Sequence, residues 1–189
     1  MMIGYAMCGS FCTHSKSIKC LESLRQTGCE ILPVVSETVY SSDTRFGSAE
    51  DLKNKLTSVC QRDVIHTIVD AEPIGPKIKL DAMIICPCTG NTLAKLALGI
   101  TDTSVTMAAK AHLRNNRPLV IALATNDALS ANLKNICTML SKKNVYFVPF
   151  GQDDPENKPH SLVADFKKVK ETLDGALQGK QIEPLIIGV

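Results

Sequence analysis

Several features that mark particular protein classes are missing from this chain of 189 residues. Aromatic residues make up only 4%, the net charge is only +2, and no basic stretch is interleaved with aromatic side chains. These properties give no support to nucleic acid or a membrane surface as a partner. No apolar run reaches the roughly 18 residues that span a bilayer, and no cationic region precedes the first hydrophobic segment. We therefore expect a cytoplasmic protein.

The common nucleotide-binding fingerprints are also missing. No Gly-x-Gly-x-x-Gly follows the first predicted strand, and Gly4 and Gly9 have the spacing of a Walker loop without the lysine that should follow. The eight cysteines include no Cys-x-x-Cys pair of the structural zinc type. Without an export signal we expect free thiols and no metal. The pairs Cys8-x-x-x-Cys12 and Cys86-x-Cys88 both follow predicted strands, which leaves a metal or redox site as the less favoured alternative.

The composition that is present fits one folded domain. Apolar residues make up 44% and charged residues 21%, which is ordinary for a globular protein and too hydrophobic for a disordered one. A chain of this length buries roughly 70% of the surface that its unfolded form exposes. We assign residues 1–177 to a single domain and 178–189 to a C-terminal tail. The apolar end of this tail is a candidate for pairing with a neighbouring subunit.

The stretch over residues 81–103 organises the chain. Residues 82–86 form a short apolar run, typical of a strand that is buried on both faces. Residues 87–92 then turn the chain into a helix with an apolar face. Three residues of this turn can each cap the helix: Thr89, Asn91 and Thr92. Because free N–H groups and hydroxyls gather at the carboxyl end of a strand here, the position favours an anion, usually a phosphate.

Short apolar strands alternate with amphipathic helices along the rest of the chain. We predict further strands at 2–7, 31–35, 64–69, 119–123 and 145–148. We predict helices between Thr13 and Gly28 and over 48–60, 105–115, 129–140 and 161–177. This alternation predicts an α/β fold, with a doubly wound, mostly parallel sheet and helices on both faces.

In such a sheet the loops after several strands share one edge. Ser10, Ser36, the 87–92 turn and the 124–127 turn should therefore meet at a single ligand crevice. Gly9 lets the backbone approach a ligand closely, and the hydroxyl of Ser10 suits a phosphate oxygen. Ser36 is equally well explained as a simple turn residue.

Charged and titratable candidates are weaker. Arg45 and Lys95 are candidates for holding a carboxylate or phosphate, although a solvated surface arginine is the commoner explanation for Arg45. Three residues are candidates for a general base, and each is better explained as a packed or surface residue: His66, Glu72 and His112. The sequence names no catalytic residue.

A family resemblance rests on the residues from 87 to 102, Pro-Cys-Thr-Gly-Asn-Thr-Leu-Ala-Lys-Leu-Ala-Leu-Gly-Ile-Thr-Asp. They resemble the signature of FMN-dependent cysteine decarboxylases and the Pro-Cys-Ser turn of flavin prenyltransferases. More closely, the chain resembles the family of dipicolinate synthase B subunits, which belongs to the same flavoprotein superfamily. The matching blocks cover most of the chain: 8–13, 42–47, 72–76, 87–103, 107–115, 125–127, 148–155 and 161–166.

The resemblance implies a Rossmann-like flavoprotein fold, a homo-oligomer and a partner, the dipicolinate synthase A subunit, that carries NADP. Together the two subunits of that family oxidise a dihydrodipicolinate-level intermediate, a small dicarboxylate, to dipicolinate during sporulation. The expected compartment is the mother cell of a spore-forming bacterium. The missing Gly-x-Gly-x-x-Gly agrees with NADP lying on the partner.

By position, the resemblance implies FMN contacts from the following residues: Gly9, Ser10, Ser36, Pro87, Thr89, Gly90, Asn91, Thr92, Thr125 and Asn126. Two departures disfavour cysteine decarboxylation. The catalytic histidine of the decarboxylases is replaced by Glu-Pro-Ile at 72–74, and their Pro-Ala-Met-Asn segment by Ala-Thr-Asn-Asp at 124–127. The pocket therefore holds FMN, an altered cofactor or the substrate itself. An independent FMN-dependent prenyltransferase or decarboxylase-like enzyme and a non-catalytic scaffold subunit remain the alternatives.

Overall fold

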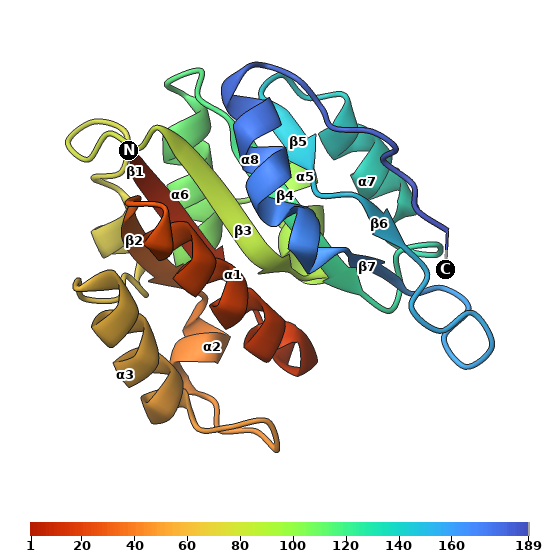
Figure 1. Cartoon of the computed structure of the whole chain (residues 1–189), viewed down its shortest axis with the longest axis horizontal. Helices are drawn as coiled ribbons and strands as arrows, with labels where there is room; N and C mark the ends of the chain where they lie inside the picture. The colour runs from red at the N-terminus through yellow and green to blue at the C-terminus, as the bar shows by residue number, and fades with distance from the viewer. Residues whose placement is uncertain (189) are drawn as a thin grey trace.

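A computed structural model describes residues 1–188 and shows an α/β fold built on one mixed sheet (Figure 1). The strand order is β2-β1-β3-β4-β7-β6, and β5 pairs with β4. The first five strands run parallel, whereas β7 runs antiparallel to β4 and β6. The strands are β1 Met2–Met7, β2 Glu30–Val35, β3 Ala82–Cys88, β4 Leu119–Thr125, β5 Val145–Phe147, β6 Phe150–Gly151 and β7 Leu162–Ala164. The predicted mostly parallel sheet is confirmed.

Helices cover both faces of the sheet, as the alternation of elements predicted. Figure 1 shows α1 and α8 in front of β3 and β4, with α5 and α6 behind them, and each of these helices contacts the sheet. The helices are α1 His14–Gln26, α2 Glu37–Ser41, α3 Ala49–Cys60, α4 Ile68–Ala71, α5 Gly90–Leu98, α6 Ser104–Leu113, α7 Leu133–Leu140 and α8 Val169–Leu177, with 3₁₀ turns at Phe11–Thr13 and Phe166–Lys168. No helix in residues 1–188 is long and apolar enough to cross a membrane.

The central strand β3 lies between β1 and β4, and all of its residues are buried. This burial explains the unbroken apolar run, because a parallel strand covered on both faces has no solvent-facing positions. The strand extends two residues beyond its predicted end, into the predicted turn, through Pro87 and Cys88. The ladder with β4 shifts register between Ile85 and Cys88. A proline, which has no N–H to donate, fits such an interruption.

The predicted strand at 64–69 is wrong. Ile65 makes only a single parallel bridge to β2, in which its N–H donates to the Pro33 carbonyl at 2.9 Å. The chain then turns at once into α4, because the hydroxyl of Thr67 accepts the N–H of Asp70 at 3.1 Å and caps the helix. The local cap thus ends the extended segment before a strand forms.

The predicted helices at 161–177 and 129–140 both begin later than expected. The first starts as β7, in which Leu162 and Val163 pair with Thr125 and Ala124 of β4, and its α-helical part begins at Val169. The second begins at Leu133, because the preceding residues are held in turns. Both segments have the apolar spacing of a helix along their whole length. Strand pairing in the first and turns in the second, which that spacing does not reveal, decide where each helix begins.

The C-terminal tail packs on its own chain. The side chain of Gln181 forms two hydrogen bonds with the backbone of Phe147, at 2.8 and 2.7 Å. Farther along, the N–H of Phe150 donates to the Leu185 carbonyl at 3.0 Å, and the N–H of Ile187 donates to the Phe150 carbonyl at 3.1 Å. Val189, the last residue of the predicted tail, lies outside the described residues. Pairing of the tail with a neighbouring subunit stays a prediction.

Candidate functional site

The loops after β1, β2 and β3 meet at the carboxyl edge of the parallel strands. The N–H of Cys8 donates to the Pro87 carbonyl, and the N–H of Ser36 donates to the Met7 carbonyl, each at 3.1 Å. The turn after β4 lies against the first residue of α5, Gly90. The structure therefore brings together the four segments that the sequence placed at one edge, because parallel strands end on the same side.

The N-terminus of α5 lies at this edge. The hydroxyl of Thr89 accepts the N–H of Thr92 at 3.3 Å, and the Thr89 carbonyl accepts the N–H of Leu93 at 2.9 Å. The first bond is a side-chain cap and the second is the first i→i−4 bond of the helix, so the N–H groups of Gly90 and Asn91 have no intrahelical partner. With the partial positive charge of the helix N-terminus, they form a suitable place for an anion.

Three of the ten predicted site residues stabilise the turns of the protein itself. Thr92 is buried, and its hydroxyl donates to the Cys8 sulfur at 3.3 Å. The hydroxyl of Thr89 donates to that of Thr92 at 3.2 Å. The hydroxyl of Thr125 donates to a carboxylate oxygen of Asp127 at 2.5 Å. These contacts fix the turns after β3 and β4.

Other predicted residues leave polar groups accessible at the edge. Ser10 is half-buried, and within residues 1–188 its hydroxyl has no hydrogen-bond partner, although its carbonyl accepts two bonds from Thr13. Asn91 and Asn126 are exposed. The hydroxyl of Ser36 caps α2 by accepting the N–H of Val39 at 3.4 Å, which matches its interpretation as a turn residue.

Asp127 and Asn132 were not among the ten predicted site residues, although Asp127 belongs to the 124–127 turn that was expected at this edge. One carboxylate oxygen of Asp127 accepts the Thr125 hydroxyl, and the other accepts the side-chain amide of Asn132 at 2.8 Å. A Cβ atom on Gly90 would lie 2.5 Å from that amide nitrogen and 2.7 Å from oxygens of Thr125 and Asp127. In the sequence, only the position of the polar residues Asp127 and Asn132 shortly after a predicted strand could have indicated that they belong to the site. We call Thr125, Asp127 and Asn132 the β4–α7 clamp.

The two cationic candidates are engaged elsewhere. The amine of Lys95 forms an ion pair with both carboxylate oxygens of Asp102, at 2.8 and 3.0 Å. This bonding to Lys95 holds the pKa of Asp102 below its usual range. Arg45 is exposed, and its guanidinium lies 4.9 Å from the centre of the Phe46 ring. The structure therefore places Lys95 in an ion pair that links α5 to the segment after it, and it leaves Arg45 in contact with Phe46 on the surface.

The three candidate bases also have structural surroundings. His66 is stacked on Tyr40 with ring centres 3.5 Å apart. His112 is buried, and its Nε2 lies 2.9 Å from the Pro118 carbonyl oxygen. Glu72 is exposed at the C-terminal end of α4.

Comparison with known proteins places this arrangement in a family. The model of the family described as Flavoprotein matches residues 1–175. The chain belongs to the flavoprotein family. This flavoprotein is 44% identical to the B subunit of dipicolinate synthase from Bacillus subtilis (strain 168) over 185 residues, which cover 98% of the chain and 92% of the relative. It is 38% identical to the flavin prenyltransferase UbiX of Thermoplasma acidophilum over 70% of the chain and 71% of that relative.

Solved structures agree with this placement. The crystal structure of the dipicolinate synthase B subunit from Bacillus halodurans matches the flavoprotein with a TM-score of 0.91 and 42% identity, covering 99% of the chain and 96% of the relative. The FMN-dependent cysteine decarboxylase SpaF matches with a TM-score of 0.70 and 22% identity, covering 94% and 95%. Because its sequence identity is only 22%, the match to SpaF shows that the fold is shared and nothing more. The resemblance to dipicolinate synthase B subunits is therefore confirmed.

Buried cysteines line the edge but are poor nucleophiles. Burial raises the pKa of Cys8 to about 11 and raises the pKa of Cys88 well above its ordinary value. Both thiols therefore stay protonated near neutral pH. Within the described part of the chain, no three His, Cys, Asp or Glu side chains are grouped as metal ligands are.

Thiol labelling tests this picture. We expect a disulfide reagent such as Ellman's reagent to modify the exposed Cys12 and Cys137 rapidly in the native flavoprotein and to spare Cys8, Cys86 and Cys88. A variant carrying Cys12→Ser and Cys137→Ser should lose most of the fast phase and keep only labelling of the half-buried Cys20, whereas all the remaining thiols react after denaturation. Fast labelling of Cys8 in peptide mass analysis would contradict the assignment.

The buried histidine makes stability depend on pH. Burial lowers the pKa of His112 below the value of about 6.5 that an unfolded chain has. The stabilising contribution is therefore present above that value and is lost as the pH falls below it, because protonation favours the unfolded state. We expect urea unfolding to show lower stability at pH 5.5 than at pH 7.5, with a smaller difference in His112→Gln. His160→Gln, at an exposed site, should keep the full difference; an unchanged pH dependence in His112→Gln contradicts the prediction.

Proposed function

We propose that this flavoprotein is the B subunit of a dipicolinate synthase. In this proposal it works with an A subunit that carries NADP, in the mother cell of a spore-forming bacterium. The support is 44% identity to the Bacillus subtilis relative over almost the whole of both chains. Residues 1–177 would form the working domain and 178–189 its tail.

The residues at the carboxyl edge fit the phosphate of FMN. Two N–H groups of α5, at Gly90 and Asn91, and the accessible hydroxyl of Ser10 are hydrogen-bond donors at the same edge of the sheet. This arrangement is the single observation that carries the proposal at the level of the site. When bound, FMN supplies a ring that accepts or donates two electrons.

We assign a role to each of the ten predicted residues. Ser10, Gly90 and Asn91 would bind the phosphate directly, while Gly9 and Ser36 line the approach from the β1 and β2 loops. Thr89, Thr92 and Thr125 hold the turns in place through the bonds described above. Pro87 joins the β1 loop to β3, and the exposed Asn126 is available to the flavin or the substrate.

The same edge suits a small dicarboxylate. Carboxylates and phosphates are both stabilised by a helix N-terminus. Conversion of a dihydropyridine to an aromatic pyridine requires only the loss of one hydride and one proton. In our proposal NADP⁺ on the A subunit would supply the hydride acceptor and water would take the proton, while the N–H groups of Gly90 and Asn91 in this chain would bind and orient the substrate.

An absorbance spectrum tests the flavin part. We expect the purified full chain, mixed with FMN and freed of the excess, to keep bands at about 370 and 450 nm. Reconstitution with an A subunit and NADP⁺ should then yield dipicolinate, and neither subunit alone should match that rate. A flat spectrum would remove FMN from the proposal, and full activity of the A subunit alone would overturn the proposed function.

A second candidate is an independent FMN-dependent enzyme of the prenyltransferase or decarboxylase type. The 38% identity to UbiX of Thermoplasma acidophilum favours it. It predicts tightly bound flavin and turnover without any partner subunit.

We also propose a homo-oligomer, because an FMN-dependent UbiX-like decarboxylase from Escherichia coli O157:H7, 25% identical, is dodecameric. Gel filtration with light scattering checks this, and a monomer would contradict it.

A further inference from the structure

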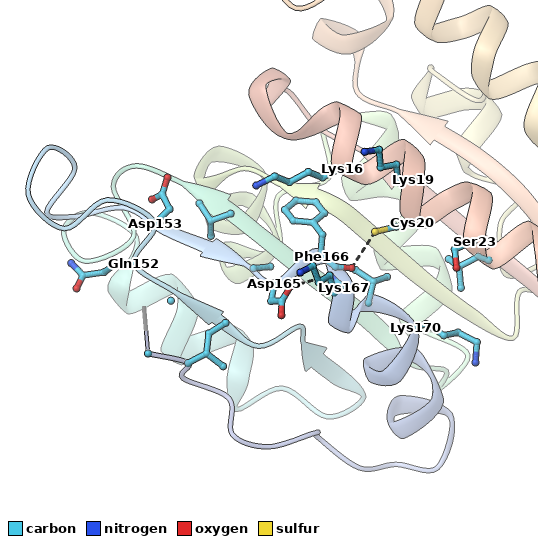
Figure 2. Close-up of a pocket in the computed structure, with 17 residues that line it drawn as sticks. Lys16, Lys19, Cys20, Ser23, Gln152, Asp153, Asp165, Phe166, Lys167 and Lys170 are labelled. Atoms are coloured by element: carbon cyan, nitrogen blue, oxygen red, sulfur yellow. Dashed lines mark hydrogen bonds between the residues drawn. The ribbon is translucent and has the colours of Figure 1, made fainter.

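A second candidate site is a cavity of about 590 Å³. Its lining residues come mainly from α1, β7 and α8 (Figure 2), and Gly151 of β6 and two residues of the tail also line it. None of the ten predicted site residues lines it. Its volume lies in the range of small-molecule sites, which is about 300–1,000 Å³.

The floor of the cavity is apolar. Leu24 comes from α1, and Phe166 and Val169 come from the segment that leads into α8. Figure 2 shows the Phe166 ring among the side chains that line the cavity. Val163, Ala164 and Ile187 complete the apolar lining. A flat ring that enters this space would exchange water for aromatic and aliphatic contacts.

The charged side chains around this floor are mainly cationic. The lining contains four lysines and two aspartates: Lys16, Lys19, Lys167, Lys170, Asp153 and Asp165. Lys170 forms an ion pair with Asp174, and Asp153 is held by Lys158 at 3.1 Å and by the Ser161 hydroxyl at 2.7 Å.

The remaining lining carboxylate is also engaged. Asp165 accepts the N–H of Lys167 at 3.0 Å. In residues 1–188, the amines of Lys16, Lys19 and Lys167 form no ion pair with a carboxylate. Three amines that lack a carboxylate partner in the described part of the chain therefore surround an apolar floor.

We propose that this cavity binds a small aromatic carboxylate. The ring would lie on the floor near Phe166, and the carboxylate groups would meet the amines of Lys16 and Lys19 on α1. A ligand with an apolar ring and anionic carboxylates complements both the apolar floor and the lysine amines of the lining. The identity of the natural ligand rests on the proposed function, because the product of that reaction, pyridine-2,6-dicarboxylate, belongs to this chemical class. The cavity is then a product site separate from the flavin edge.

Calorimetric titration of the full chain at low salt tests the proposal. The probes are benzene-1,3-dicarboxylate, pyridine-2,6-dicarboxylate and the non-aromatic propane-1,3-dicarboxylate. We expect both aromatic acids to bind at least tenfold more tightly than the aliphatic one. The variant with Lys16→Ala and Lys19→Ala should lose at least tenfold in affinity for the aromatic acids. Since both lysines are on the surface of α1, the variant should fold normally.

The matched control changes the same charge elsewhere. Lys134→Ala with Lys143→Ala removes two exposed lysines near α7 and should leave the affinity unchanged. No binding of either aromatic acid, equal binding of the aliphatic acid, or equal losses in the two lysine variants would overturn the proposal. Because benzene-1,3-dicarboxylate binding needs no synthase activity, this result is independent of whether the proposed function fails.

Discussion

Gly90→Ala is expected to lower the free energy of unfolding by about 1–3 kcal/mol, the usual cost of overpacking a well-packed site. The added methyl group would lie 2.5 Å from the Asn132 amide nitrogen and 2.7 Å from oxygens of Thr125 and Asp127. These atoms are hydrogen-bonded to one another, so none can move away freely. Helix propensity alone favours alanine by about 0.5–1 kcal/mol, so a net loss shows that the β4–α7 clamp decides the outcome. Urea unfolding at neutral pH measures it.

Gly9→Ala is the matched control. Its added methyl group would approach only the Phe11 ring, at 3.4 Å, which is ordinary van der Waals contact. We expect its stability to stay within about 0.5 kcal/mol of the wild-type value, as for most surface substitutions. If FMN binds as proposed, Gly90→Ala should also weaken flavin binding, because the clamp fixes the start of α5. Equal stability of Gly90→Ala and the wild type would contradict the prediction, because it would show that the side chains of the β4–α7 clamp move aside for the methyl group.

Asn91→Asp is expected to change folding stability and anion binding in opposite directions. A carboxylate in the first turn of α5 is favoured by the helix dipole, so the free energy of unfolding should rise by about 0.3–1 kcal/mol. A phosphate at the same N-terminus would be repelled. Two unit charges about 5 Å apart, in an effective dielectric of about 20, repel by about 3 kcal/mol. That energy corresponds to a loss of about 100-fold in FMN affinity, measured by fluorescence titration.

The control for this substitution separates charge from lost hydrogen bonding. Asn91→Ala removes the amide without adding a charge and should bind FMN more weakly than the wild type but more tightly than Asn91→Asp. In the complex with the A subunit, a fall in dipicolinate formation of more than about tenfold, roughly 1.4 kcal/mol, would exclude a purely scaffolding subunit. Unchanged affinity and activity in Asn91→Asp would contradict a phosphate site at α5.

Local signals were sufficient for much of the fold. The apolar run of β3 identified a strand buried on both faces, and all of its residues are buried. Ser48 and Thr89 were expected near helix starts, and each accepts the backbone N–H three residues later. Both kinds of evidence act within a few residues, so a sequence contains them completely.

The errors occurred where partners distant in sequence compete with local pattern. Ile65 and its neighbours are as apolar as a strand, but β2 accepts only one bridge there before Thr67 caps α4. Leu162 has the spacing of the final helix, yet it pairs with Thr125 in the sheet. Neither competition is visible in the residues of the segment itself.

The candidate site divides in the same way. Residue order and pattern were enough to place Ser10, Asn91 and the 124–127 turn at one edge, because parallel strands with alternating helices end on a common side. What each residue contacts could be learned only from the folded structure. The Thr92 hydroxyl donates to the Cys8 sulfur, 84 positions away, and the side chain of Asn132 leaves no room for a Cβ atom on Gly90. Such contacts depend on which distant atoms meet, and the packing of α5 against the β1 and β4 loops settles that.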